Sequence, residues 1–277
     1  MELDNYNNII SEIHDKYYGA QDTYCDKKDE LFKYTGDYIK TEKILINTDE
    51  IKSDHIRYKI IISKLEDAEN GYGYTNLRIL GDPKNIEYIE LCVGGQRFDR
   101  IHPSIFGHLS FDCFTRCIMP ALQHHRYELY ILYNSTVGTI EIEFDIYKIN
   151  NYINNEFWFK QCQFNGIETI KINMKNKVKV NFNHPVFKLY VLCESNLVNL
   201  HLSIEDGDNN YVIPYSYKEY NKYVFDFNNT INFSRIDNIY IKFDPLDNDA
   251  ELAIYSDNFQ MARCSTSHGM IGLLYSK

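Results

Sequence analysis

Apolar and polar residues alternate along many short segments of this chain, most clearly over residues 139–146. Even positions in that run carry isoleucine or phenylalanine, and odd positions from 141 onward carry glutamate or aspartate. Because successive side chains of a β-strand point to opposite faces, this period of two predicts a strand with one buried and one solvated face. The run 139–146 is therefore the clearest strand that the sequence predicts.

The same kind of alternation recurs along the rest of the chain. Regular runs lie at 178–182, 198–205, 223–227 and 239–243, and less regular strand candidates cover 55–65, 74–80, 85–93, 127–133, 187–193 and 250–256. Turn residues such as Asn70-Gly71 and Asn165-Gly166 separate them. Helical periodicity is credible only over 7–17 and 104–117. The pattern predicts an all-β sandwich or jelly roll with few short helices.

The strand series is interrupted near the middle of the 277-residue chain by an asparagine-rich segment, 148–156. The remaining lengths on either side suit two β modules of about 100 to 150 residues each, which is the usual size of a domain. We therefore expect two modules that meet near residue 150.

Composition supports a β fold and excludes some functions. The chain has 24 Tyr and 16 Phe against one Trp, and aromatic residues favour strands. Its net charge of −10 and pI of about 5.4 disfavour a protein that wraps nucleic acid. With a mean hydropathy of −0.43, no apolar run approaches the roughly 20 residues that a membrane helix needs.

The cysteines and the first residues indicate the compartment. Seven cysteines are an odd number, and most lie in apolar stretches such as Leu91-Cys92-Val93, so we expect reduced core thiols in a cytosolic setting. The first residues contain no basic segment followed by an apolar one, so no secretory signal is predicted.

Three groups of residues invite a chemical hypothesis, and each has a simpler structural explanation. A zinc site is suggested by His102, His108, Cys113, Cys117, His124 and His125. These residues lack the compact paired spacing of zinc ligands, so packed or surface side chains are favoured. Ser234, Asp237 and His184 are favoured as turn chemistry over a hydrolase triad, because the chain has no Gly-x-Ser-x-Gly turn.

The acidic residues Glu141, Glu143 and Asp145 could hold a glycosidase pair, but a solvated or subunit-facing strand surface has the same pattern. The segment Gly94-Gly95-Gln96 lacks the further residues of a phosphate loop. We therefore expect no catalytic residues, no cofactor and no metal site.

Seven segments in collinear order resemble the major capsid protein family of nucleocytoplasmic large DNA viruses. They are 18–24 followed by 31–33, 89–99 with its Gly-Gly-Gln, 120–125, 161–166, 181–189 with Asn-His-Pro-Val, 232–238 with Asn-Phe-Ser-Arg, and 255–276. The first block departs from the family by carrying Cys25-Asp26-Lys27-Lys28 where a Gly-Asn-Pro turn is usual.

The resemblance implies a double jelly roll, in which two antiparallel eight-stranded sandwiches lie side by side. It implies an N-terminal arm or helix at 1–17, an N-terminal roll at 18–150 and a C-terminal roll at 151–277. Three such chains would form a pseudo-hexagonal capsomer of an icosahedral virion that is assembled in the host cytoplasm. The implied partners are further copies, neighbouring capsomers, minor capsid proteins and an inner viral membrane, without direct contact to nucleic acid.

Three other roles stay open at this stage. A minor capsid paralogue and a transient assembly scaffold share the fold of a shell protein. A carbohydrate-binding attachment module would use the aromatic surplus, although one Trp is a poor supply for sugar stacking.

Local chemistry gives the matched blocks an architectural role. Pro185 restricts His184 to extended geometry and can begin a strand, which would place Phe187, Leu189 and Val191 on one face. Asn232 and its neighbours suit a turn, in which Arg235 and Asp237 could pair. Gly94-Gly95 permits positive φ angles in a tight bend.

Overall fold

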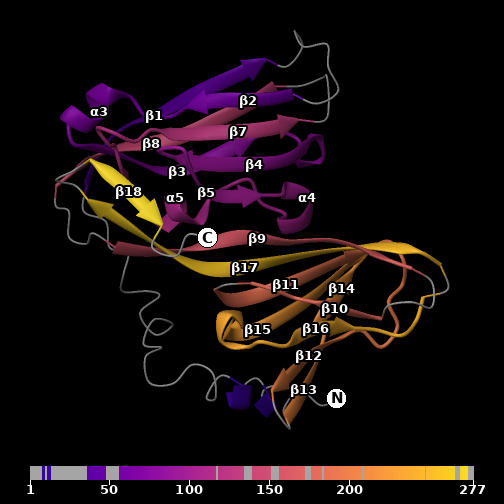
Figure 1. The fold of residues 1–277 in the computed structure, drawn as a ribbon. Helices are drawn as coiled ribbons and strands as arrows, with labels where there is room; N and C mark the ends of the chain where they lie inside the picture. The colour runs from indigo at the N-terminus through magenta and orange to yellow at the C-terminus, as the bar shows by residue number, and fades with distance from the viewer. Residues whose placement is uncertain are drawn as a thin grey trace. The chain divides into compact units, whose positions relative to one another are not determined.

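The computed structural model describes residues 8–9, 11–13, 36–47, 56–116, 118–133, 139–150, 156–171, 176–182, 184–206, 209–246, 248–265 and 269–273. These residues are mostly antiparallel strands, as the alternation predicts (Figure 1). Of the predicted helix at 7–17, residues 8–9 and 11–13 are described and are helical. No helix in the described ranges is long and apolar enough to cross a membrane.

The chain divides into two compact units, each of which is described by itself. The N-roll unit comprises Asp29–Gln161 and Gln260–Lys277. The C-roll unit comprises Met1–Lys28 and Cys162–Phe259.

The first eight strands form two four-stranded sheets. They are β1 (Gly36–Asn47), β2 (Ile56–Ile61), β3 (Tyr72–Leu80), β4 (Ile86–Val93), β5 (Gln96–Ile101), β6 (Met119–Pro120), β7 (Tyr127–Tyr133) and β8 (Thr139–Ile149). One sheet has the order β1-β8-β3-β6 and the other the order β2-β7-β4-β5. The first strand thus pairs with the eighth, the second with the seventh, the third with the sixth and the fourth with the fifth.

The later strands repeat this nested pairing. They are β9 (Glu156–Ile170), β10 (Lys177–Lys179), β11 (Pro185–Cys193), β12 (His201–Asp206), β13 (Asn209–Pro214), β14 (Tyr217–Glu219), β15 (Lys222–Asn232), β16 (Ile239–Lys242), β17 (Ala250–Ser265) and β18 (Met270–Leu273). Without β14 and β18, the pairs are β9 with β17, β10 with β16, β11 with β15 and β12 with β13.

Nested pairing of eight strands describes one long hairpin rolled into a sandwich, which is a jelly roll. Because both sets of strands show it, the predicted double jelly roll of two antiparallel eight-stranded sandwiches is confirmed. The strands β14 and β18 stand outside this nested pairing: β14 extends the sheet beside β15, and β18 pairs with the end of β17, which belongs to the N-roll unit.

Burial follows the predicted alternation most regularly on β8. From Ile140 to Ile146 the even positions are fully buried and the odd positions are intermediate. Phe144 packs edge-to-face on Tyr74 with ring centroids 5.7 Å apart, and Tyr74 packs likewise on Tyr127 at 5.9 Å. In the C-roll unit, a separate buried cluster contains Ile13, Ile170 and apolar residues between Val178 and Ile254.

The helices are short. They are α3 (Leu65–Glu69), α4 (Pro103–Phe106), α5 (Asp112–Arg116) and the 3-10 turns η2 (Pro83–Asn85) and η3 (Phe233–Arg235). The helical segment predicted over 104–117 is therefore two short helices. Gly107 ends α4 with a φ of 72°, a left-handed conformation that favours glycine.

The structure corrects one expectation about β11. The strand begins at Pro185 as predicted, but a register shift between Val186 and Lys188 places a bulge at Phe187. Val186, Leu189 and Val191 belong to the buried cluster, and Phe187 instead packs against the Phe259 ring at 4.0 Å. A bulge adds one residue to the strand, so the side chains before and after it no longer keep one alternation.

The predicted domain boundaries stay predictions. The first set of eight strands ends at Ile149 and the second begins at Glu156, near the expected boundary at 150 and 151. The compact units instead change over at Gln161 within β9 and again at Phe259 within β17, and they assign 260–277 to the N-roll unit. Residues 14–35, which include the boundary expected after 17, lie outside the described residues.

Candidate assembly site

Three of the sequence blocks meet at one place in the N-roll unit. His125, from the block 120–125, has its Nδ1 3.1 Å from the carbonyl oxygen and 3.3 Å from the amide nitrogen of Ile271 in β18. The His125 ring also lies against Gly94, where an added Cβ would come within 2.6 Å of the ring. The ring therefore joins the β4–β5 turn to the C-terminal strand.

The turn beside His125 uses both glycines as predicted. Val93 pairs with Gln96, so Gly94 and Gly95 form a two-residue turn, and their φ angles are 58° and 82°. Two positive φ angles at the centre of a two-residue hairpin suit the twist of the strands, and glycine adopts them without a steric penalty.

Further hydrogen bonds connect β18 and the residue before it to the same region. The amide of His124 donates to the carbonyl oxygen of Gly269 at 3.2 Å, and the amide of Leu273 donates to Oε1 of Gln96 at 3.4 Å. A Cβ on Gly269 would lie 2.9 Å from the Cβ of Gln123. Glycine at this position therefore permits a close approach between two blocks that are far apart in the sequence.

The block 161–166 contributes polar side chains that are buried, as at Gln161, or partly buried, as at Gln163. Nε2 of Gln161 donates to the carbonyl oxygen of Phe98 at 2.5 Å within the N-roll unit. In the C-roll unit, Nδ2 of Asn258 donates to Oε1 of Gln163 at 2.9 Å, and Oη of Tyr190 donates to Asp257 at 2.8 Å. Buried polar groups with partners specify one register of the strands that carry them.

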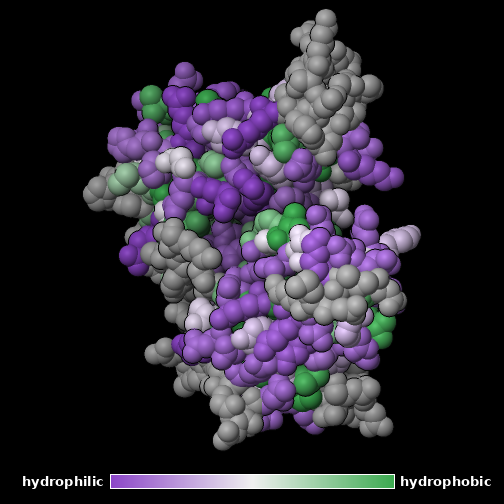
Figure 2. Space-filling view, turned by 45° about the vertical axis from the view of Figure 1, so that its right-hand side comes forward, coloured by the Kyte–Doolittle hydropathy of each residue, from purple (hydrophilic) through white to green (hydrophobic). Residues whose placement is uncertain are grey.

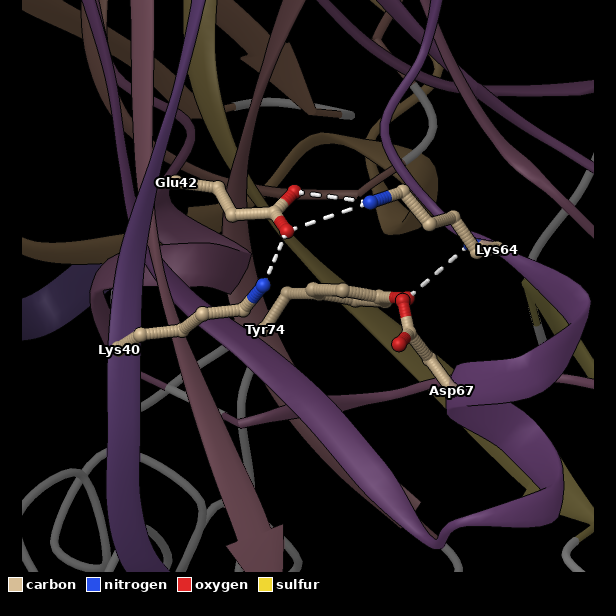
Figure 3. Close-up of polar contacts among 5 residues, drawn as sticks. All are labelled: Lys40, Glu42, Lys64, Asp67 and Tyr74. Carbon is tan, nitrogen blue, oxygen red and sulfur yellow. Dashed lines mark hydrogen bonds and ion pairs between the residues drawn. The ribbon is translucent and has the colours of Figure 1, made fainter.

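Strand β1 is one edge of its sheet and is held by a polar cluster (Figure 3). The carboxylate of Glu42 accepts from Nζ of Lys40 at 2.6 Å and from Nζ of Lys64 at 3.2 Å. Burial alone would raise the pKa of Glu42, but these two ammonium groups lower it below its usual value. Beside them, buried Tyr74 donates to Asp67 of α3 at 2.6 Å, and burial raises the Tyr74 pKa well above its ordinary value.

The acidic residues of β8 have polar partners across the sheet. Glu143 pairs with Nζ of Lys43 at 2.9 Å and with Arg78 at 3.1 Å, and Glu141 pairs with the same Lys43 at 2.7 Å. Asp145 accepts from Oγ1 of Thr41 at 2.6 Å. The outer face of this sheet is therefore a paired, partly solvated surface, which is one of the two structural explanations that the sequence left open.

The residues considered for zinc do not assemble into a ligand set within the described part of the chain. Cys113 is fully buried, and burial raises the pKa of its thiol. Nδ1 of His108 lies 3.1 Å from the carbonyl oxygen of Ser110. Burial, together with the charge of Arg100, lowers the pKa of His102 to about 4. Cys117 lies outside the described residues.

Five of the seven cysteines, at positions 92, 113, 162, 193 and 264, are described, and they form no disulfide there. Four of these five are buried, as the apolar sequence context predicts.

Of the residues weighed as a hydrolase triad, Ser234 lies in the turn η3. Oδ1 of Asn232 accepts from the Ser234 amide at 3.2 Å and from the Ser234 hydroxyl at 2.6 Å, which caps η3. His184 is buried just before β11. Asn232 pairs with Pro185, so this turn joins the two matched blocks of the C-roll unit.

No sequence pattern predicted the buried carboxylate of Glu90 in β4. Glu90 is 5% exposed and accepts from Arg57 at 3.1 Å and from Nε of Arg100 at 2.9 Å. The Arg57 guanidinium also lies 4.2 Å from the centroid of the Tyr130 ring. Glu90 lies in a largely apolar run of the sequence, and only the sheet order β2-β7-β4-β5 shows that Arg57 of β2 and Arg100 of β5 face it.

Comparison with known proteins identifies the fold. No family model matches the chain, and no curated protein sequence matches it. The solved structure of PBCV-1 VP54, fitted into a reconstruction of the virophage Sputnik, is similar with a TM-score of 0.62 at 15% identity. That similarity covers 89% of this chain and 99% of the other chain.

A quasi-atomic description of the PBCV-1 virus capsid is similar with a TM-score of 0.58 at 14% identity, again over 89% and 99% of the two chains. At such low identity the likeness shows the fold alone. This chain therefore has the double jelly-roll fold of these capsid proteins, as the collinear blocks predicted.

Proposed function

We propose that this protein is a non-enzymatic structural protein of a viral capsid. The observation that carries the proposal is the repeated nested strand pairing, which puts two jelly rolls of one kind into a single chain. Its likeness to a PBCV-1 capsid protein over 89% of this chain supports the same role.

The capsomer would be a trimer of this chain. Each chain contains two similar jelly rolls, so three chains around a threefold axis place six similar rolls in a ring. Such a ring has a pseudo-hexagonal outline. In a closed cyclic trimer, each contact joins two different surfaces of the chain. Such contacts can cover sheet edges, such as that of β1, which a monomer leaves exposed. The partners are then further copies of the chain and neighbouring proteins of the shell, including minor capsid proteins, and the place of action is the virion.

The polar, paired surfaces described above suit this role better than catalysis. Glu141 and Glu143 on β8 are paired with cations, and Ser234 takes part in the cap of η3. The acidic net charge of −10 supports a shell without direct contact to a packaged genome.

Two measurements test the proposal. Size-exclusion chromatography with light scattering should show a trimer, and electron microscopy should show three-lobed particles or a lattice. A monomer under all concentrations and salt conditions would contradict the proposal. Mass spectrometry of purified virions separates the related roles, because a shell or minor capsid protein stays in the particle and a scaffold does not.

A further inference from the structure

Tyr220 occupies a backbone conformation that tyrosine rarely adopts. It is the first of two residues in the turn between β14 and β15, where Glu219 pairs with Lys222, and its φ is 51°. The other described non-glycine residues with positive φ are all asparagines, at positions 76, 199 and 228. Glycine and asparagine suit this region, and a bulky side chain is strained there.

Among the described residues, the tyrosine ring has no packing contact that would offset this strain. Tyr220 is 99% exposed, the largest value among the described large apolar or aromatic side chains that are exposed. Neighbouring groups have partners of their own: Lys222 pairs with Glu219 at 2.8 Å, and Nζ of Lys218 donates to Asn196 at 2.7 Å. A strained, solvent-facing aromatic ring is best explained by a contact outside the molecule.

The surroundings of Tyr220 favour a protein surface as its partner. Tyr217 on β14 is 40% exposed and Tyr215, just before β14, is 37% exposed, so three partly or fully exposed tyrosines lie within six positions of the sequence at this hairpin. On the face that Figure 2 shows, hydrophilic residues predominate among those described, and hydrophobic ones form small separate patches. Isolated tyrosine anchors carry much of the binding energy in such polar interfaces.

Charge favours a second copy of this chain as that protein. Residues 215–223 contain two lysines and one glutamate, and Lys222 pairs with Glu219, so Lys218 leaves the hairpin with one excess positive charge on a chain whose net charge is −10. A tyrosine-bearing hairpin with a net positive charge is attracted to a copy whose net charge is negative.

We propose that the β14–β15 hairpin binds a second copy of this chain, with Tyr220 as its anchor and Tyr215 and Tyr217 beside it. The inference rests on the proposed capsid function and deepens it, because it names one surface through which copies associate.

Sedimentation velocity over a range of protein concentrations tests the inference with two variants. Tyr220→Asn removes the ring and fits the positive φ, so it should melt at or above the wild-type temperature while association weakens by about tenfold or more. Tyr220→Phe is the matched control: it keeps the ring and the strain, and its association should stay within about threefold of wild type.

The outcomes separate the two proposals. If wild type associates and Tyr220→Asn associates equally well, the hairpin assignment is wrong and the capsid proposal stands. If wild type stays monomeric throughout, both are wrong. If wild type binds sugars on a glycan array, and Tyr220→Asn loses that binding but not its association, the hairpin serves attachment and the inference of a second copy is overturned.

Discussion

Nδ1 of His125 lies 3.3 Å from the amide nitrogen of Ile271, so a side chain just before β7 is joined to the last described strand across 146 positions of sequence. The same ring lies over Gly94, where it leaves no room for a Cβ. This contact makes the C-terminal strand β18 part of the N-roll unit, and it can be tested at the glycine.

Gly94→Ala should destabilise the fold by about 2 kcal/mol or more, because the new Cβ meets the His125 ring and the residue keeps a φ of 58°. Gly95→Ala is the matched control: its φ is 82°, but nothing lies within 4 Å of the added Cβ, so a loss of about 1 kcal/mol is expected. Urea unfolding measures both. Equal losses would show that the His125 contact does not matter.

Glu90→Gln should lower the free energy of unfolding by about 1–3 kcal/mol, because a buried carboxylate that binds two arginines would become a neutral amide. Glu128→Gln serves as the comparison, since the Lys59 side chain that pairs with Glu128 is 49% exposed and such a pair contributes under about 1 kcal/mol. Chemical denaturation of the two variants should rank them in this order, and the reverse order would refute it.

His102 predicts a specific dependence on pH. Burial and Arg100 lower its folded pKa from 6.5 to about 4, so the folded state binds this proton less readily than the unfolded state. The stabilising contribution of neutral His102 is therefore complete above about pH 6.5 and is lost as the pH falls through about 4. Tm measured from pH 7 to 4 should fall more steeply for wild type than for His102→Gln. His124→Gln, which changes an exposed histidine instead of a partly buried one, is the comparison variant.

Asn232→Ala should destabilise the C-roll unit by about 1 kcal/mol, because the cap of η3 loses its acceptor for the Ser234 amide and hydroxyl. Asn238→Ala removes only a 3.2 Å bond from Tyr240 on the exposed side, and a change below about 0.5 kcal/mol is expected. Thermal melts that show no difference between these variants would argue against the cap.

The local sequence predicted many strands because their two faces differ in solvent exposure. On β8 the alternation of isoleucine and phenylalanine with acidic residues agrees with the observed burial from Ile140 to Ile146. Strand β1 was missed, since as a sheet edge it has exposed apolar side chains such as Leu45, 67% exposed, and no clear alternation. Strand β9 was missed too, and it carries exposed Phe164 and Ile167 next to buried Gln161.

The candidate site was predictable in its parts but not in its assembly. The positive φ angles of Gly94 and Gly95 and the turn at Asn232 follow from local chemistry. The contacts of His125 with Gly94 and Ile271 do not follow from local chemistry, because no periodicity or motif around this histidine indicates its partners. Tyr220 was also missed, since its strain is a property of the backbone rather than of the residue type.

By itself, the sequence determined an all-β chain, because residues of alternating polarity form a buried face only when they are extended. Its collinear blocks also indicated the double jelly roll. Tertiary structure decided which strands pair and which cations bind the carboxylate of Glu90. It also decided the bulge at Phe187, which turns this side chain away from the face that Leu189 and Val191 share. The reason is that hydrophobic period specifies the face that a strand buries, whereas pairing depends on backbone hydrogen bonds between residues far apart in the chain.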